Sequence, residues 1–351
     1  MGHAVDLETD RAALVTVRAR PFNAETPTAA LREFITPTTA HYVRSNFELP
    51  HHDGAVHVSG EVDRPRMLTL DDLRALPTAT LRVTLECAGN GRAGMAPLPT
   101  GEPWLGNAVA TAEWTGARLA HVLDRVGPQP RGVAVAFMGA DHGSYKGGPD
   151  IAYIRSLPID FALDPTADIL LAYEMNGEPL TPDHGAPVRL IVPRWYGMAS
   201  VKWLARMDVL PAPYEGQFQS RSYVYEWPDG RHEPVTTQRV RAIITDPTPG
   251  AILPPGPHEV RGWAWSGAAP VTAVEISIDG AGDWQPAHLT PTSAPYAWQP
   301  WTFTWEATEP ARHVLRARAT DDTGATQPDT PPWNRLGYGN NAVGVVVVDV
   351  R

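Results

Sequence analysis

Short apolar stretches alternating with polar positions dominate the last third of the chain. Strand-like runs cover 240–245, 260–265, 271–278, 301–305, 313–320 and 343–350, with Asp-, Gly- and Pro-rich turns between them. Short strands separated by turn residues are typical of an all-β sandwich. Pro- and Gly-rich segments at 226–234 and 247–257 bracket the first run, so we place a domain boundary at 237/238.

The preceding residues mix helical and strand patterns. Apolar residues at i, i+3, i+4 and i+7 predict a helix over 119–126 that ends at Gly127. Thr69 and Asp72 are typical of a capping box that starts a second short helix. Strands are predicted at 81–85, 132–137, 169–173 and 188–192. This mixture indicates an α+β domain, and two domains fit a chain of 351 residues.

Charge and cysteine content exclude several functions. Lys and Arg number 29 against 39 Asp and Glu, and the net charge of −10 argues against binding to nucleic acid or to an anionic membrane. No run approaches the roughly 18 apolar residues of a membrane helix. Residues 1–20 lack a signal-peptide pattern, so we expect a cytoplasmic protein. The single cysteine excludes an intrachain disulfide, a Cys-rich zinc site and a Cys-x-x-Cys-His haem site.

That cysteine, Cys87, directly follows a predicted strand in the segment Thr84-Leu-Glu-Cys-Ala-Gly-Asn-Gly-Arg92. A glycine-containing turn would bring the thiol to a loop surface, where Arg92 favours the thiolate. The structural alternative is a small buried hydrophobe. A reachable thiolate is either a nucleophile, with His142 or His184 as base, or a ligand of a soft metal. No protease signature surrounds it.

A second segment, 181–203, concentrates groups that bind anions. Its potential donors are His184, Arg189, Arg194 and Lys202. Such density in an acidic chain predicts a phosphate or oxyanion site, and the alternative is a solvated strand edge. Arg44 lies in a third, extended segment at 41–50.

Together these segments resemble the sulfite oxidase family of molybdopterin enzymes over nearly the whole chain. The motifs, in order, are Tyr42-Val-Arg-Ser-Asn46, Cys87-Ala-Gly-Asn-Gly-Arg92, Trp104 ahead of Trp114-Thr-Gly-Ala-Arg-Leu119, and then 170–177, 183–189, 200–203, 262–267, 327–330 and Trp333-Asn334. The resemblance implies an α+β molybdopterin-binding domain over 1–237 and an immunoglobulin-like dimerisation domain over 238–351. We therefore expect a homodimer, and seven of the 12 tryptophans lie from Trp263 onward, more than one small core needs.

The resemblance also implies roles for individual residues. Cys87 is the thiolate ligand of molybdenum. The expected cofactor contacts are Tyr42, Val43, Arg44, Ser45, Asn46, Asp141, His184, Arg189, Ser200, Val201 and Lys202. The expected substrate pocket is formed by Arg44, Arg92, Trp104 and Tyr223. The implied activity is oxidation of sulfite to sulfate by oxo transfer. Since no haem domain accompanies the motifs, we expect the electrons to go to a separate acceptor, a cytochrome, another redox protein or oxygen.

Three positions depart from the family pattern. Gly91 replaces an arginine of the ligand motif, and Ser222 replaces the acidic residue before the active-site tyrosine. The family's C-terminal pocket arginine falls on Leu336, with Arg335 one residue earlier. In a strand this shift reverses the side chain, whereas a turn could redirect it. The missing charge leaves open another oxyanion or a neutral sulfoxide as substrate, and a cofactor-free binding protein is a third hypothesis.

Overall fold

Two five-stranded sheets form the framework of the first domain in the computed structural model, which describes residues 11–280 and 282–351. One sheet has the order β10-β9-β6-β5, with β11 against β9, and the other the order β4-β3-β12-β7-β8. The bounds are β3 (Val56–Gly60), β4 (Arg66–Leu68), β5 (Thr78–Glu86), β6 (Val109–Arg118), β7 (Ala134–Ser144), β8 (Asp150–Pro158), β9 (Leu170–Met175), β10 (Glu178–Pro179), β11 (Arg189–Ile191) and β12 (Leu204–Leu210). Residues 1–10, part of the segment predicted to lack a signal peptide, lie outside the described residues.

The helices of this domain are short. They are α2 (Leu70–Arg74), α3 (Leu119–Val126) and α4 (Ile159–Leu163). The predicted capping box is present, because the Thr69 hydroxyl accepts from the Asp72 amide while the Asp72 carboxylate accepts from the Thr69 amide. Helix α3 ends at Gly127, whose φ of 66° lies in the left-handed region. Both sequence predictions are confirmed, and no helix in the described part of the chain has the length and apolarity needed to span a membrane.

Single turns and short strand pairs connect these elements and carry much of the site. The turns are η1 (Thr28–Arg32), η2 (Thr38–Ala40), η3 (Arg92–Gly94), η4 (Pro165–Ala167), η5 (Pro182–His184), η6 (Gly197–Ala199) and the π-helical η7 (Gln217–Arg221). The strand pairs are β1 (Val15–Arg18) with β2 (Asn23–Glu25), and β13 (Val224–Glu226) with β14 (His232–Pro234).

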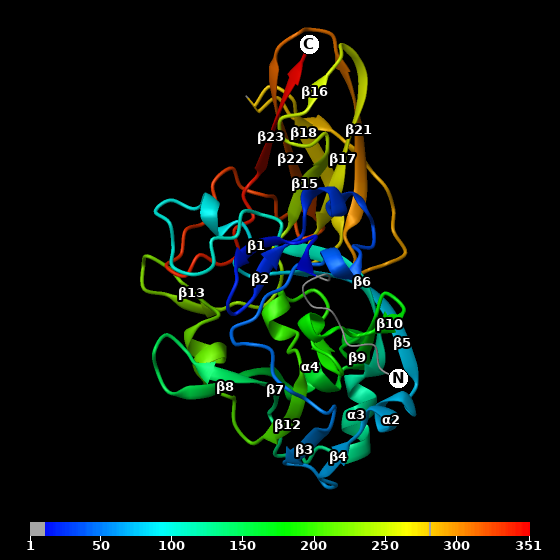
Figure 1. The fold of residues 1–351 in the computed structure, drawn as a ribbon, viewed down its shortest axis with the longest axis vertical. Coiled ribbons are helices and arrows are strands. Elements are labelled where there is room, and N and C mark those ends of the chain that lie inside the picture. The colour runs from blue at the N-terminus through cyan, green and yellow to red at the C-terminus, as the bar shows by residue number, and fades with distance from the viewer. Residues whose placement is uncertain (1–10, 281) are drawn as a thin grey trace.

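The C-terminal region is a two-sheet β-sandwich, as the alternating pattern predicted (Figure 1). Its sheets have the orders β15-β17-β21-β20 and β16-β23-β22-β18-β19. The bounds are β15 (Arg241–Asp246), β16 (Ile252–Leu253), β17 (Gly256–Trp265), β18 (Val271–Ser277), β19 (Gln285–Pro286), β20 (His288–Leu289), β21 (Gln299–Ala307), β22 (Arg312–Asp321) and β23 (Gly344–Val350). The predicted boundary at 237/238 falls between β14 and β15.

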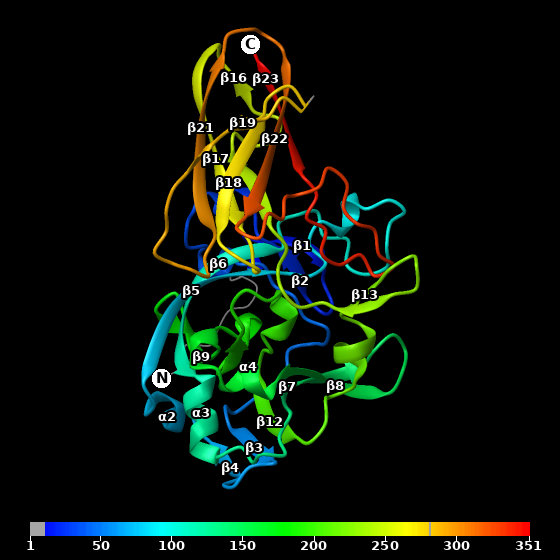
Figure 2. The ribbon, with the colours of Figure 1, turned by 180° about the vertical axis from the view of Figure 1, so that it is seen from behind.

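A tryptophan cluster joins the sandwich to the first domain. Trp263 and Trp298 stack with ring centroids 5.2 Å apart, and both pack with Leu31 and Val109 of the first domain. The Trp298 indole also donates to the Phe34 carbonyl at 2.9 Å. The two views in Figures 1 and 2 show the dark-blue ribbon that follows residue 11 lying against the base of the sandwich. These tryptophans fill an intramolecular contact, so the tryptophan count gives no support for a dimer.

Replacing Trp298 with alanine should destabilise the protein strongly, because this fully buried ring bridges the two domains. We expect Trp298→Ala to lower the free energy of unfolding by about 3–5 kcal/mol, measured by urea denaturation. The control is Trp284→Ala, since the Trp284 ring is only half-buried against Arg316 and Arg318. Equal losses in the two variants would contradict a special role for the interdomain cluster.

Candidate active site

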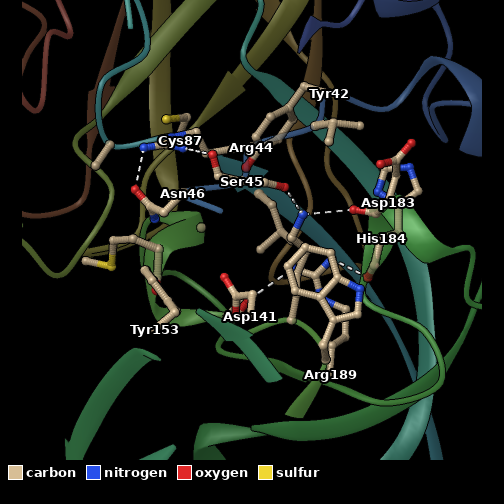
Figure 3. A pocket seen from close by; sticks show the side chains of 18 of the residues that line it. Tyr42, Arg44, Ser45, Asn46, Cys87, Asp141, Tyr153, Asp183, His184 and Arg189 are labelled. Atoms are coloured by element: carbon tan, nitrogen blue, oxygen red, sulfur yellow. Dashed lines mark hydrogen bonds between the residues drawn. The ribbon is translucent and has the colours of Figure 1, made fainter. Parts of the chain in front are cut away.

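A pocket lies where the predicted motifs converge (Figure 3). All predicted cofactor contacts except Val201 line it, namely Tyr42, Val43, Arg44, Ser45, Asn46, Asp141, His184, Arg189, Ser200 and Lys202, together with Cys87 and Tyr223. Val201 is buried in the core behind the wall, and its carbonyl accepts from the Leu190 amide. Eight further lining residues are not among the predicted contacts, namely His41, Leu85, Ala88, Tyr153, Asp183, Gly197, Met198 and Trp203.

Cys87 forms one end of the pocket. It directly follows β5, its amide donates to the Ala108 carbonyl, and its carbonyl accepts from Asn90 in the turn that follows. The side chain is buried but faces the cavity. Burial raises the pKa of the thiol, opposed first by Arg44 and less by Arg92. Arg92 lowers the thiol pKa as expected, and Arg44, which the sequence did not connect with the thiol, lowers it more.

A buried ion pair holds the turn that carries Cys87. The Glu86 carboxylate accepts from Arg241 at 2.8 Å, from the Trp265 indole at 3.1 Å and from the Asn90 amide at 3.0 Å. Arg241 and Trp265 belong to the sandwich, so the C-terminal domain fixes the position of the thiol. The sequence signal of this ion pair was Glu86 itself, next to Cys87 at the end of a strand, because a carboxylate buried there requires a partner.

The opposite end of the pocket is rich in desolvated positive groups. Arg189 donates to the carbonyls of His184 and Ser200, and Lys202 donates to the Ser45 hydroxyl and the Asp183 carbonyl. Burial lowers the pKa of Arg189 to about 10 and that of His184 to about 3, and it also lowers the pKa of Lys202. Among the described residues neither Arg189 nor Lys202 forms an ion pair.

The acids near this end do not neutralise it. Asp183 already binds Arg11 through two hydrogen bonds of 2.7 Å, and burial raises the pKa of Asp141. The Arg189 Nε is a buried donor without a hydrogen-bond partner. The neutral His41 ring donates from Nδ1 to the Tyr42 carbonyl, so its unpartnered Nε2 is an acceptor. The buried cations and the orphaned Arg189 donor require an anionic ligand.

Two predicted donors lie elsewhere. The Arg194 guanidinium packs over the Tyr296 ring, 5.3 Å from its centroid, on a surface shared with the sandwich. His142 is exposed and pairs with Asp150 at 2.9 Å. Of the four donors predicted in the segment 181–203, three therefore converge and Arg194 does not, because its backbone adopts a left-handed turn with φ of 68°. His142 cannot serve Cys87 as a base from this position.

A hydrogen-bonded chain lies beside the Cys87 end. Arg44 donates to the Asn46 side-chain carbonyl at 2.7 Å, and the Asn46 amide donates to the Tyr223 hydroxyl at 3.3 Å. The Tyr223 oxygen accepts in this contact, which leaves its proton free for another acceptor. Arg44 and Tyr223 thus offer a charged donor and a neutral donor toward the same cavity.

Arg92 and Trp104, both predicted in the substrate pocket, stand behind its lining. The Arg92 guanidinium donates to the carbonyls of Leu336 at 3.1 Å and Glu102 at 2.8 Å, so its donors face the protein. Trp104 is fully buried and packs in the cluster that contains Tyr42 and Cys87. Trp104 does not line the pocket itself, and its predicted contact with substrate stays a prediction.

The C-terminal segment forms a turn at Arg335 and Leu336, not a strand. The turn sends Arg335 away from the cavity, where its guanidinium pairs with Glu226 and its side chain is 62% exposed. The Leu336 side chain is buried, and neither residue lines the pocket. The suggestion that a turn could deliver Arg335 to the site was wrong, because the ion pair with Glu226 holds the side chain on the surface.

One cysteine thiol, facing buried cations across a pocket, defines a metallocofactor-binding protein. No group of three or more His, Cys, Asp or Glu side chains in residues 11–280 and 282–351 could hold a metal. A metal at Cys87 therefore needs its other ligands from a cofactor, and the cation end suits the phosphate with which such a cofactor ends. The residues fit a molybdopterin cofactor at both ends of the pocket.

Comparison with known proteins agrees with this assignment. Residues 46–218 match the model of the oxidoreductase molybdopterin-binding domain, and residues 233–350 match that of the molybdenum-cofactor oxidoreductase dimerisation domain. The sulfite oxidase of Gallus gallus is 37% identical, with 91% of this chain and 74% of that protein covered. The chain belongs to the sulfite oxidase family.

Other relatives show how broad this family is. The mitochondrial sulfite oxidase of Mus musculus is 36% identical over 92% of this chain, which spans 63% of that protein's length. An NADH nitrate reductase of Solanum lycopersicum is 35% identical over 92% of this chain and 39% of its own length. The solved structure of the sulfane dehydrogenase SoxCD from Paracoccus pantotrophus matches with a TM-score of 0.81 and 28% identity, covering 100% of this chain and 95% of that one.

The neutral state of buried His184 makes stability depend on pH. Its pKa is about 3 in the folded protein, against about 6.5 in an unfolded chain. Below about pH 6.5 only the unfolded state takes up this proton, so stability should fall by about 1.4 kcal/mol per pH unit toward pH 4. In cofactor-free protein, His184→Gln should remove this proton's contribution, about 1.4 kcal/mol per pH unit, from the pH dependence of the unfolding free energy. Urea unfolding across that pH range measures it. An unchanged slope would contradict the burial of a neutral imidazole.

Proposed function

We propose that the protein oxidises sulfite to sulfate and passes the electrons to a separate acceptor. The observation that carries this proposal is the chain of Arg44, Asn46 and Tyr223 beside the Cys87 thiol. It offers positive charge and hydrogen-bond donors to an oxyanion next to the predicted metal ligand. The similarity to sulfite oxidases supports the same substrate.

The chain's own residues act mainly by binding and orientation. When bound, the molybdenum cofactor supplies two-electron redox and oxygen-transfer chemistry. Cys87 would ligate the metal, while Arg189 and Lys202 would hold the anionic end of the cofactor. Neutral His184, whose Nε2 donates to the Thr38 carbonyl, would offer its Nδ1 as an acceptor to the cofactor's donors. Arg44 would bind the oxyanion, and Tyr223 would orient it with its free hydroxyl proton.

A second candidate keeps the cofactor and changes the substrate. Leu336 stands where the family has an arginine, and Arg335 points to Glu226, so the pocket has less positive charge than the family pattern provides. This favours another oxyanion, or the reduction of a neutral sulfoxide. Nitrate reductases and a sulfane dehydrogenase among the similar proteins keep this candidate open. The cofactor-free hypothesis does not explain why buried cations lack acidic partners.

Sulfite, nitrate and dimethyl sulfoxide, assayed in steady state with artificial electron carriers, separate the two candidates. We expect sulfite to give the highest kcat/KM. Arg44→Met should raise the KM for sulfite by about ten- to a hundredfold, because a charge-assisted bond contributes about 1.5–3 kcal/mol. Arg335→Ala is the matched control and should leave KM within about twofold, since a surface ion pair contributes about 0–1 kcal/mol.

If kcat/KM is higher for nitrate or for the sulfoxide than for sulfite, sulfite is not the preferred substrate and the second candidate is correct. A tenfold rise in KM for Arg335→Ala would mean that Arg335 reaches the substrate after all.

We further propose that residues 238–351 mediate a homodimer. The match of residues 233–350 to a dimerisation domain supports this assembly. Light scattering should give twice the 38.1 kDa chain mass at about micromolar concentration. A monomer mass that persists as the concentration is raised would contradict the proposal.

A further inference from the structure

Two guanidinium groups flank a pair of tyrosine rings at the Tyr223 side of the pocket. The Arg155 guanidinium lies 5.6 Å from the centroid of the Tyr223 ring. Tyr223 packs on Tyr338 with centroids 5.4 Å apart, and Arg92 lies 5.1 Å from the Tyr338 ring. The stack joins β8, the pocket tyrosine, the C-terminal loop and the turn after Cys87. Neither the sequence motifs nor the family resemblance singled out Arg155.

Arg155 is a buried cation without a carboxylate partner. Its residue is 2% exposed, and it forms no ion pair with any described residue. Its Nη1 donates to the Phe218 carbonyl, while its Nε has no hydrogen-bond partner. The ionisable groups that face it are the hydroxyls of Tyr153, Tyr223 and Tyr338. A cation taken out of water in this way is costly unless an anion lies nearby, and no carboxylate among residues 11–280 and 282–351 pairs with it.

The cavity borders this stack, because two of the tyrosines that face Arg155 line it. Tyr153 lies two residues before Arg155, on the same face of β8, and lines the pocket (Figure 3). Tyr223 lines the same pocket. The Tyr223 hydroxyl accepts from Asn46, so its proton is free to point at a bound ligand. A positive charge over the ring strengthens that donation to an anion, because the field acts through a medium of low polarity.

We propose that Arg155 is a positioning residue that acts through Tyr223 and supplies positive charge for an oxyanion substrate in place of the arginine missing at Leu336. The inference rests on the proposed oxidation of an oxyanion. It adds a specificity determinant that comes from β8 and not from the C-terminal domain. A neutral substrate such as a sulfoxide gains nothing from this charge.

The test uses the oxidised holoenzyme and sulfate as the probe. Arg155→Gln keeps an amide that can donate to the Phe218 carbonyl but removes the charge. We expect it to weaken sulfate binding, measured by calorimetry, and to raise the sulfite KM, each by about tenfold, with kcat changed less than about twofold. Arg155→Lys, which restores the charge, should recover most of the affinity. The KM for dimethyl sulfoxide should not change.

Arg239→Gln is the matched control. Arg239 also stacks on a tyrosine, 4.7 Å from the Tyr225 ring, and donates to the Gly339 carbonyl, but it does not line the pocket. It should leave sulfate affinity unchanged. A double variant with Tyr223→Phe adds a second readout, since removing the hydroxyl should abolish most of the effect of Arg155→Gln.

The outcomes separate the inference from the proposed function. Sulfate affinity equal in Arg155→Gln and Arg239→Gln, or a fall in kcat with unchanged KM, would overturn the role of Arg155. If sulfite is not oxidised but Arg155→Gln still weakens sulfate binding tenfold, the inference stands and the proposed substrate fails. If the Arg155→Gln protein does not take up molybdenum, the Arg155→Lys variant decides. Native sulfate affinity in folded Arg155→Lys supports the proposal, and tenfold weaker sulfate binding overturns it.

Discussion

Positive charge buried without acidic partners is the constraint on which the site depends. Arg189 and Lys202 donate to carbonyls and a hydroxyl and not to carboxylates, and Arg11 already occupies the carboxylate of Asp183. Such an arrangement is unfavourable in the empty protein and becomes favourable when an anion binds. The pocket is therefore built for an anionic cofactor, and binding of that cofactor should stabilise the fold.

The two domains cooperate at the metal end of the same pocket. Glu86, next to Cys87, accepts from Arg241 and Trp265 of the sandwich, so the thiol is positioned by a contact that spans the domains. Trp263 and Trp298 pack in the same contact between the two domains. Because both contacts are buried, the sandwich contributes to the site even though none of its residues lines the pocket.

Local signals allowed the sequence to predict much of this structure. The capping box at Thr69, the α3 spacing and the alternating sandwich strands each depend on neighbouring residues. Strand β6 was missed because nearly all of its side chains are buried, so its sequence does not alternate between apolar and polar residues. The motifs located the pocket, but the side-chain directions of Arg92 and Arg335 depend on Leu336 and Glu226, partners more than a hundred residues away. Arg155 was missed for the same reason, because its relation to Tyr223 exists only in the folded chain.

X-ray absorption at the molybdenum edge, together with the metal content of the purified protein, shows whether this pocket holds a molybdenum cofactor through Cys87. We expect about one molybdenum per chain and a shell of sulfur ligands that loses one sulfur in the Cys87→Ser variant. Protein without molybdenum from a host that makes the cofactor, or an unchanged sulfur shell in Cys87→Ser, would contradict this assignment.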